Sequence, residues 1–184
     1  LMSVRQCIVH DLENTASGAI CGISATIGTG VPKAITNNIV YGLLHDGYAT
    51  FDSGIKLIGA GGSYISPNTI YDIAGSASTA YGIQMQDAAS RRYQNNVCCN
   101  AGDADYSVAS PASATCDHNL SSDATASGTG SLTNKTAANQ FVSTVGGSED
   151  LHLKAGADAI EAGKFSKGEL NGQLYKAEIP EDDV

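Results

Sequence analysis

The chain has 184 residues, of which 42% are hydrophobic, so it is long enough and apolar enough to fold around a sizeable core. Its 21 glycines, its lack of tryptophan and its 16% of charged residues favour strands and turns over long helices. A net charge of −9 offers no basic surface to a phosphate backbone, which argues against nucleic acid as a partner, and no apolar run reaches the roughly 18 residues of a membrane span.

A short segment recurs along the first two thirds of the chain. Each copy has an apolar residue, two mostly polar residues, a position that is Asn in four of the five copies, and then the start of a strand-like stretch. The copies are residues 4–9, 35–40, 65–70, 93–98 and 116–121. Their fourth positions are 31, 30, 28 and 23 residues apart, which suits one solenoid turn per copy with loops of variable length.

A second recurring segment lies between the copies of the first, at residues 53–58, 81–85 and 105–108. Lys56, Gln84 and Ser107 hold equivalent positions in it, 28 and 23 residues apart, which matches the last two steps of the first pattern. Apolar residues alternate with polar ones, as Ile55 and Leu57 do with Lys56, which is typical of a half-buried strand. Two strands per turn therefore keep step along the chain.

Together these patterns predict an all-β right-handed parallel β-helix of about four to five turns, ending in a cap. Equivalent inward residues should stack into a ladder of Ile, Val, Leu, Tyr and Cys, with Ile39, Ile70 and Val97 one above another. We expect the recurring Asn to occupy a bend with left-handed backbone and to bond through its amide to the Asn one turn away. The alternative for this Asn series is a set of ordinary turn residues.

The rest of the chain predicts the end of the solenoid. The domain organisation is β-helix turns over residues 1–122, a Ser/Thr/Gly-rich loop or loosely packed last turn over 123–140, and a capping segment with an acidic tail over 141–184. Within that last segment, residues 141–145 and 151–153 are expected to be strands, and residues 155–162 a brief helical turn. These elements should close the open end of the solenoid.

Residues 150–163 read Asp-Leu-His-Leu-Lys-Ala-Gly-Ala-Asp-Ala-Ile-Glu-Ala-Gly. This stretch resembles the closing motif of right-handed, pectate-lyase-like β-helix proteins, including those called choice-of-anchor Q domain proteins. Ala157 and Asp158 stand where that family has Ser-Pro, and Glu161 stands where it has Asp. The resemblance implies the β-helix fold and an extracellular, cell-surface or virion setting. Some relatives by this motif cleave polysaccharides, but the likeness carries no reaction over to this chain.

Five cysteines are an odd number and show no CxxC spacing, which disfavours both a zinc site and a complete disulfide framework. They are expected to pack as small hydrophobic side chains. The pairs His10-Asp11 and His45-Asp46 lack the Gly-x-Ser-x-Gly turn of a hydrolase, so we expect them in surface turns. No metal site and no cofactor is predicted.

Enzymatic cleavage of a polysaccharide would require further groups. A lyase of the pectate type needs clustered Asp residues for calcium and a nearby base, and Lys56 is the one base candidate on its face. A glycoside hydrolase needs two carboxyl groups facing one sugar, for which Asp87 with Asp103 or Asp105 is the only pairing. Neither set is complete, so no catalytic residue is predicted.

Polar side chains on stacked strands suit hydrogen bonding to sugar hydroxyls. The predicted carbohydrate-binding residues are Lys56, Gln84, Gln86, Asp87, Arg91 and Arg92. The predicted function is a non-enzymatic structural or adhesive module of a secreted, cell-surface or virion protein, with a surface glycan, a homotrimer or a larger surface assembly as partners. Two alternatives stay open: a polysaccharide lyase or hydrolase whose active site lies upstream or between subunits, and a protein-binding spacer or virion-decorating module.

Overall fold

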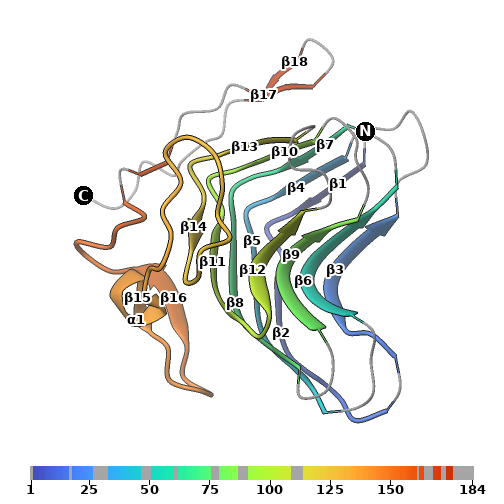
Figure 1. Cartoon of the computed structure of the whole chain (residues 1–184), viewed down its shortest axis with the longest axis vertical. Coiled ribbons are helices and arrows are strands. Elements are labelled where there is room, and N and C mark those ends of the chain that lie inside the picture. Colours follow the sequence, from blue (N-terminus) through green and yellow to red (C-terminus); the bar gives the residue numbers. More distant parts are fainter. Residues whose placement is uncertain are drawn as a thin grey trace.

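The computed structural model describes residues 2–16, 18–26, 33–46, 51–59, 62–75, 79–86, 91–108, 114–160, 162–163, 168–170 and 173–175. Its main strands form three parallel sheets that wind into a right-handed parallel β-helix, which confirms the predicted fold class (Figure 1). Each coil adds one strand to sheet A, then to sheet B, then to sheet C. We number the coils as residues 2–26, 33–58, 63–85, 91–108 and 114–121, the fifth of which contributes to sheets A and B.

Each sheet is named here by its strands in coil order. Sheet A contains β1 (Met2–Arg5), β4 (Lys33–Thr36), β7 (Ser63–Ile65), β10 (Arg91–Gln94) and β13 (Ala114–Asp117). Sheet B contains β2 (Ile8–Asn14), β5 (Asn38–His45), β8 (Asn68–Gly75), β11 (Val97–Ala101) and β14 (Leu120–Ser121). Sheet C contains β3 (Cys21–Thr26), β6 (Phe51–Ile58), β9 (Thr79–Met85) and β12 (Ala104–Val108).

Apolar side chains fill the interior in columns that run from coil to coil, as predicted. Strand pairing places Ile35, Ile65 and Tyr93 in one column of sheet A, and all three are essentially inaccessible to solvent. The expected stack of Ile39, Ile70 and Val97 was wrong by one residue. Ile39 and Val97 flank Thr69 on the outer face of sheet B. Ile70 instead belongs to an inward column, in which it lies between Val40 and Cys98. Because side chains of a strand alternate between faces, a shift of one position exchanges inside for outside.

The recurring Asn residues form the predicted ladder. The side-chain amide of Asn38 donates to Asn68 Oδ1 (2.9 Å), that of Asn68 to Asn96 Oδ1 (3.0 Å) and that of Asn96 to Asn119 Oδ1 (3.0 Å). Each Asn also donates to a backbone carbonyl of the preceding coil. All four side chains are buried, so the ladder satisfies polar groups that water does not reach.

The left-handed backbone, in contrast, is not at the ladder position. The residue just before it has a positive φ in coils 1, 2, 4 and 5, namely Gln6 (55°), Asn37 (56°), Asn95 (57°) and His118 (53°). Coil 3 has Pro67 there, whose ring excludes positive φ. A second such column crosses the middle of sheet B and consists of Asp11, Gly42, Asp72 and Asn100. Coils 1, 2 and 4 therefore have two left-handed positions each, and most of these are Asn, Asp or Gly, the residue types that tolerate this conformation best.

A shortened rung covers the interior after coil 5. Leu132 pairs in parallel with Leu120, and Ala126 packs into the core cluster that contains Tyr106. Asp123 accepts hydrogen bonds from the backbone of Asp105 (3.0 Å) and Thr125 (2.9 Å). Residues 123–140 thus contain packed and hydrogen-bonded positions, and their last four, Ala137–Gln140, form the short helix α1.

The two strands predicted near the C-terminus are present as β15 (Phe141–Ser143) and β16 (Asp150–Leu153), which pair antiparallel. They do not lie across the open end of the solenoid. Phe141 packs edge-on against Tyr71 (centroids 5.8 Å apart) and joins the apolar cluster on the outer face of sheet B, so the hairpin covers the side of the helix (Figure 1).

The predicted helical turn at 155–162 is a pair of hydrogen-bonded turns over its described residues, with Ala157 N–H bonded to Lys154 O and Ile160 N–H to Ala157 O. A second antiparallel pair, β17 (Gly168–Leu170) and β18 (Gln173–Tyr175), follows. The acidic tail and Glu161 lie outside the described residues.

Candidate functional site

The strands of sheet C bow toward the core, which leaves their outer face concave (Figure 1). Three stacked glycines, Gly22, Gly54 and Gly82, stand at the bend. A Cβ atom on Gly54 would lie 2.7 Å from Ile70 Cγ2 and 2.8 Å from the carbonyl oxygen of Gly82. Only glycine therefore lets the strands approach the interior closely enough to bow.

Lys56 and Gln84 project from this concave face. Lys56 lies between Ile55 and Leu57, which point into the core, and it pairs with Gln84 in the next coil. Gln84 pairs in turn with Ser107, so the column inferred from equal spacing in the sequence is confirmed. Ser24 of coil 1 extends the same column.

An aromatic pair lies beside that column. The rings of Phe51 and Tyr81 stack with centroids 6.4 Å apart, and Lys56 Nζ lies 5.6 Å from the centroid of Phe51. Phe51 is 38% exposed, which is unusual for a phenylalanine in a strand that otherwise buries most of its side chains. The ammonium group above an aromatic face is a favourable cation–π arrangement.

The buried hydroxyl group of Ser53 orients the side-chain amide of Gln84. Ser53 is fully buried, and its Oγ–H donates to Gln84 Oε1 (3.2 Å). Gln84 is only 4% exposed, and none of the described residues accepts a hydrogen bond from its Nε2. The hydrogen bond from Ser53 therefore fixes the orientation of the Gln84 amide, most of whose surface is covered by protein.

Cys21 occupies the same outward column as Ser53 and Tyr81. Burial raises the pKa of its thiol, and this effect outweighs the opposing influence of the Lys56 charge. The thiol is therefore protonated at neutral pH and is a poor nucleophile. We call Cys21, Phe51, Ser53, Lys56, Tyr81 and Gln84 the sheet C cluster.

The structure separates the other predicted binding residues from this cluster. Gln86 directly follows the C-terminal end of β9 and is half-buried. Arg92 lies in β10 and pairs with Tyr64, so it belongs to sheet A, and Arg91 is in the same strand. Asp87 lies outside the described residues. The dense polar segment of the sequence thus spans a corner of the solenoid and does not form one face.

Phe51, Tyr81, Ser53 and Cys21 were not singled out from the sequence. Ser53 and Tyr81 hold equivalent outward positions 28 residues apart, the same step that aligned Lys56 with Gln84. Ser53 and Tyr81 are the first residues of the recurring segments 53–58 and 81–85, and extending the first of these by two residues adds Phe51. Cys21 would have been found only by tracing the segment into coil 1.

The carboxylates considered for glycosidase chemistry are occupied by the backbone. Asp105 is buried, and its oxygens accept hydrogen bonds from Ala101 N (3.0 Å) and from Ser122 Oγ (2.8 Å). Burial raises the pKa of Asp105, although these hydrogen bonds oppose the shift. Asp103 accepts from Ala80 N (2.6 Å). Both carboxylates accept hydrogen bonds from backbone N–H groups at the ends of strands. This arrangement gives no support to a catalytic pair of either residue with Asp87.

Neither His-Asp pair lies in the surface turn that was expected. His10 is exposed, bonds Asp11 Oδ2 (2.8 Å) and stacks on Tyr41, but the pair lies within strand β2. His45 is fully buried and bonds Asp52, so its expected place in a surface turn was wrong. The pairing partner lies seven residues on because the chain turns the corner from sheet B to sheet C between them.

Of the five cysteines, all unpaired, Cys98 and Cys99 are buried as predicted, and Cys7, Cys21 and Cys116 are half-buried. The described residues contain no group of three or more His, Cys, Asp or Glu side chains placed to hold a metal ion. No described helix is both long enough and apolar enough to cross a bilayer. Comparisons of the chain with protein-family models, with curated proteins and with solved structures give no match.

Proposed function

We propose that this chain is a non-enzymatic β-helix module that binds acidic glycans on the outer face of sheet C. The observation that carries the proposal is the position of Lys56 over the exposed ring of Phe51, next to the oriented amide of Gln84. Aromatic rings with a few fixed polar groups are the usual composition of small-ligand sites. Sugar rings present apolar C–H faces that pack on such rings.

The charge of the cluster supports an anionic ligand. Its polar ends are mainly hydrogen-bond donors, because Lys56 has only donors and Gln84 Oε1 already accepts from Ser53. Asp52, the nearest carboxylate along β6, is turned to His45 and to the N–H of Ile20. A uronate or sulfate group would therefore meet donors here, whereas the net charge of −9 disfavours anions elsewhere on the protein.

The setting that we propose is a secreted, cell-surface or virion protein, either as a homotrimer or within a larger surface assembly. It is supported by the resemblance of residues 150–163 to the closing motif of surface β-helix proteins. The repetitive, concave face of sheet C (Figure 1) also suits contact with an extended chain.

Replacing Lys56 or Phe51 with alanine tests the proposed binding site. Lys56→Ala and Phe51→Ala should each weaken binding of an acidic polysaccharide, such as polygalacturonate, by on the order of tenfold, because each loses an interaction of about 1–2 kcal/mol. Affinity electrophoresis or calorimetry at low salt measures this change. Raising the salt should weaken wild-type binding, since a charged contact is screened.

Matched substitutions far from sheet C provide the controls. Lys154→Ala removes a lysine from the C-terminal segment, and Val145→Ala shortens an apolar side chain that is 66% exposed. Both should bind like the wild type. Equal affinity of all four variants for polygalacturonate would refute the proposed site.

The reaction products distinguish a polysaccharide lyase or hydrolase from a non-enzymatic binding module. A lyase would generate unsaturated ends that absorb in the ultraviolet, and a hydrolase would generate reducing ends. If either product accumulates with the wild type and is lost in Lys56→Ala, the module is an enzyme and the non-enzymatic proposal fails. Absence of both binding and cleavage over acidic and neutral polysaccharides would favour the protein-binding spacer.

A further inference from the structure

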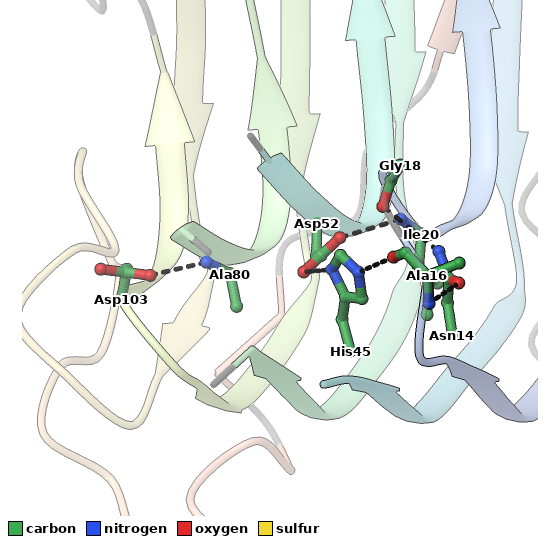
Figure 2. Close-up of polar contacts among 8 residues, drawn as sticks. All are labelled: Asn14, Ala16, Gly18, Ile20, His45, Asp52, Ala80 and Asp103. Atoms are coloured by element: carbon green, nitrogen blue, oxygen red, sulfur yellow. Dashed lines mark hydrogen bonds and ion pairs between the residues drawn. The ribbon is translucent and has the colours of Figure 1, made fainter. Parts of the chain in front are cut away.

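His45 is a fully buried histidine whose two ring nitrogens both meet oxygen atoms. Nδ1 lies 2.9 Å from Asp52 Oδ2, and Nε2 lies 3.0 Å from the carbonyl oxygen of Ala16 (Figure 2). The second carboxylate oxygen, Asp52 Oδ1, accepts a hydrogen bond from Ile20 N (2.8 Å). The three contacts join the end of β5, the start of β6 and the connection between β2 and β3 in coil 1.

Counting protons shows what this geometry requires. A backbone carbonyl only accepts, so Nε2 must carry a proton toward Ala16. The contact between Nδ1 and Asp52 needs a second proton, whether it rests on the ring or on the carboxylate. The unit is thus complete only when it holds one proton more than a neutral imidazole with an ionised carboxylate. Losing that proton leaves a ring lone pair facing Asp52 Oδ2 in a site shielded from water.

The charges around the ring favour retention of the proton. The hydrogen bond to Ala16 raises the pKa of His45, burial opposes it, and Asp52 and the adjacent Asp46 raise it further. The strand neighbours of His45 are Asn14 in coil 1 and Gly75 in coil 3, and Ile20 lies on the other side of Asp52; none of these three carries a charge. The net result is a pKa above the ordinary value.

An equivalent corner elsewhere in the helix lacks the histidine. Asp52 pairs with Ala80 in the next coil, and Asp103 accepts a hydrogen bond from Ala80 N just as Asp52 accepts one from Ile20 N (Figure 2). The Asp therefore caps an N–H of the preceding coil in both places. The corner of coil 4 between β11 and β12 consists of Gly102 and Asp103, so it forms this cap without a histidine. The contacts of His45 with Asp52 and Ala16 are therefore additional to the cap, which forms in coil 4 without them.

We propose that His45, Asp52 and Ala16 form a proton-dependent latch that joins coil 1 to coil 2 at the entrance to sheet C. The latch is closed while its extra proton is bound and opens in mildly alkaline solution. Its position gives the opening a local consequence, because Asp52 lies between Phe51 and Ser53 of the sheet C cluster. The latch stands on its own geometry and does not depend on the proposed ligand.

The direction of the pH dependence follows from linkage. The folded protein holds the proton more tightly than the unfolded chain, in which a histidine has a pKa of about 6.5. The stabilisation is therefore complete below about pH 6.5 and is lost as the pH rises through the higher folded value. Each unit by which folding raises that pKa changes the unfolding equilibrium about tenfold.

Asp52→Asn is the informative variant because it can keep the three hydrogen bonds described above without the extra proton. The new amide can accept from Ile20 N and donate to a neutral Nδ1, while Nε2–H still donates to Ala16. Wild-type urea midpoints should fall between about pH 6.5 and 9, and those of Asp52→Asn should stay level over that range. Asp103→Asn removes the same charge from the corner without histidine, and it should follow the wild-type profile.

Two further measurements keep the test decisive if a variant folds poorly. In the wild type, protection of the Ile20 amide from hydrogen exchange should decrease with rising pH relative to that of the Ala80 amide, which has an equivalent cap. The ring nitrogens of His45 should titrate above 6.5 by NMR. A ring that titrates at or below that value, or identical pH profiles for wild type and Asp52→Asn, would overturn the latch.

Discussion

Replacing Asn68 with Ala is expected to destabilise the protein by on the order of 4 kcal/mol, because the substitution interrupts a buried ladder at its centre. Asn68 Oδ1 accepts from the backbone and side-chain nitrogens of Asn38 (3.1 and 2.9 Å). Asn68 Nδ2 donates to Ile35 O and to Asn96 Oδ1 (both 3.0 Å). Alanine would leave these partners unsatisfied at a position that is 4% exposed. Each unsatisfied buried group costs about 1–3 kcal/mol, and relaxation or an entering water offsets part of the sum.

Urea unfolding followed by circular dichroism measures this loss. Asn139→Ala, at an exposed position in α1, serves as the control and should change the midpoint little. Asn68→Asp is the sharper comparison, since it keeps the shape but places a carboxylate oxygen against Ile35 O and Asn96 Oδ1. It should be at least as destabilising as alanine at neutral pH and should recover in acid. A stability of Asn68→Ala close to that of Asn139→Ala would show that the ladder is not a source of stability.

Gly82→Ala is expected to destabilise the protein by about 3 kcal/mol, although it adds a single methyl group. The new Cβ would lie 1.9 Å from Cys98 Sγ and 2.7 Å from the carbonyl oxygen of Asp105. The first neighbour is a buried core side chain and the second is backbone of the next coil, so neither can move aside without disturbing a packed column. The effect is one of contact, because Gly82 is not among the residues with positive φ.

Gly146→Ala is the matched control, since a Cβ there meets nothing within 4 Å. It should leave the urea midpoint unchanged or slightly raised. Cys98→Ala combined with Gly82→Ala should restore only part of the loss, because the contact with Asp105 O remains. Similar midpoints for Gly82→Ala and Gly146→Ala would mean that sheet C has room at its bend, and the physical reason given for its bowing would be wrong.

Much of the fold is predictable because a solenoid repeats its contacts at a short step along the chain. Once Asn38, Asn68 and Asn96 are aligned, the register of neighbouring strands follows, and with it the column of Lys56 and Gln84. The side-chain alternation then separates inward from outward positions. The same regularity explains why the period of the hydrophobic pattern and the Asn ladder were predicted correctly.

The spacing of residues along the chain is enough to predict the β-helix, the alignment of its coils, the Asn ladder and the strands of the C-terminal hairpin. It does not predict which residues of sheet B face inward, which residue carries the left-handed bend, or that His45 meets Asp52. Nor does it predict that Phe141 packs on the side of sheet B or that Phe51 and Lys56 share a bowed face. The difference is physical: stacking between coils depends on spacing along the chain, whereas contacts around a corner depend on backbone angles that the spacing of residues does not specify.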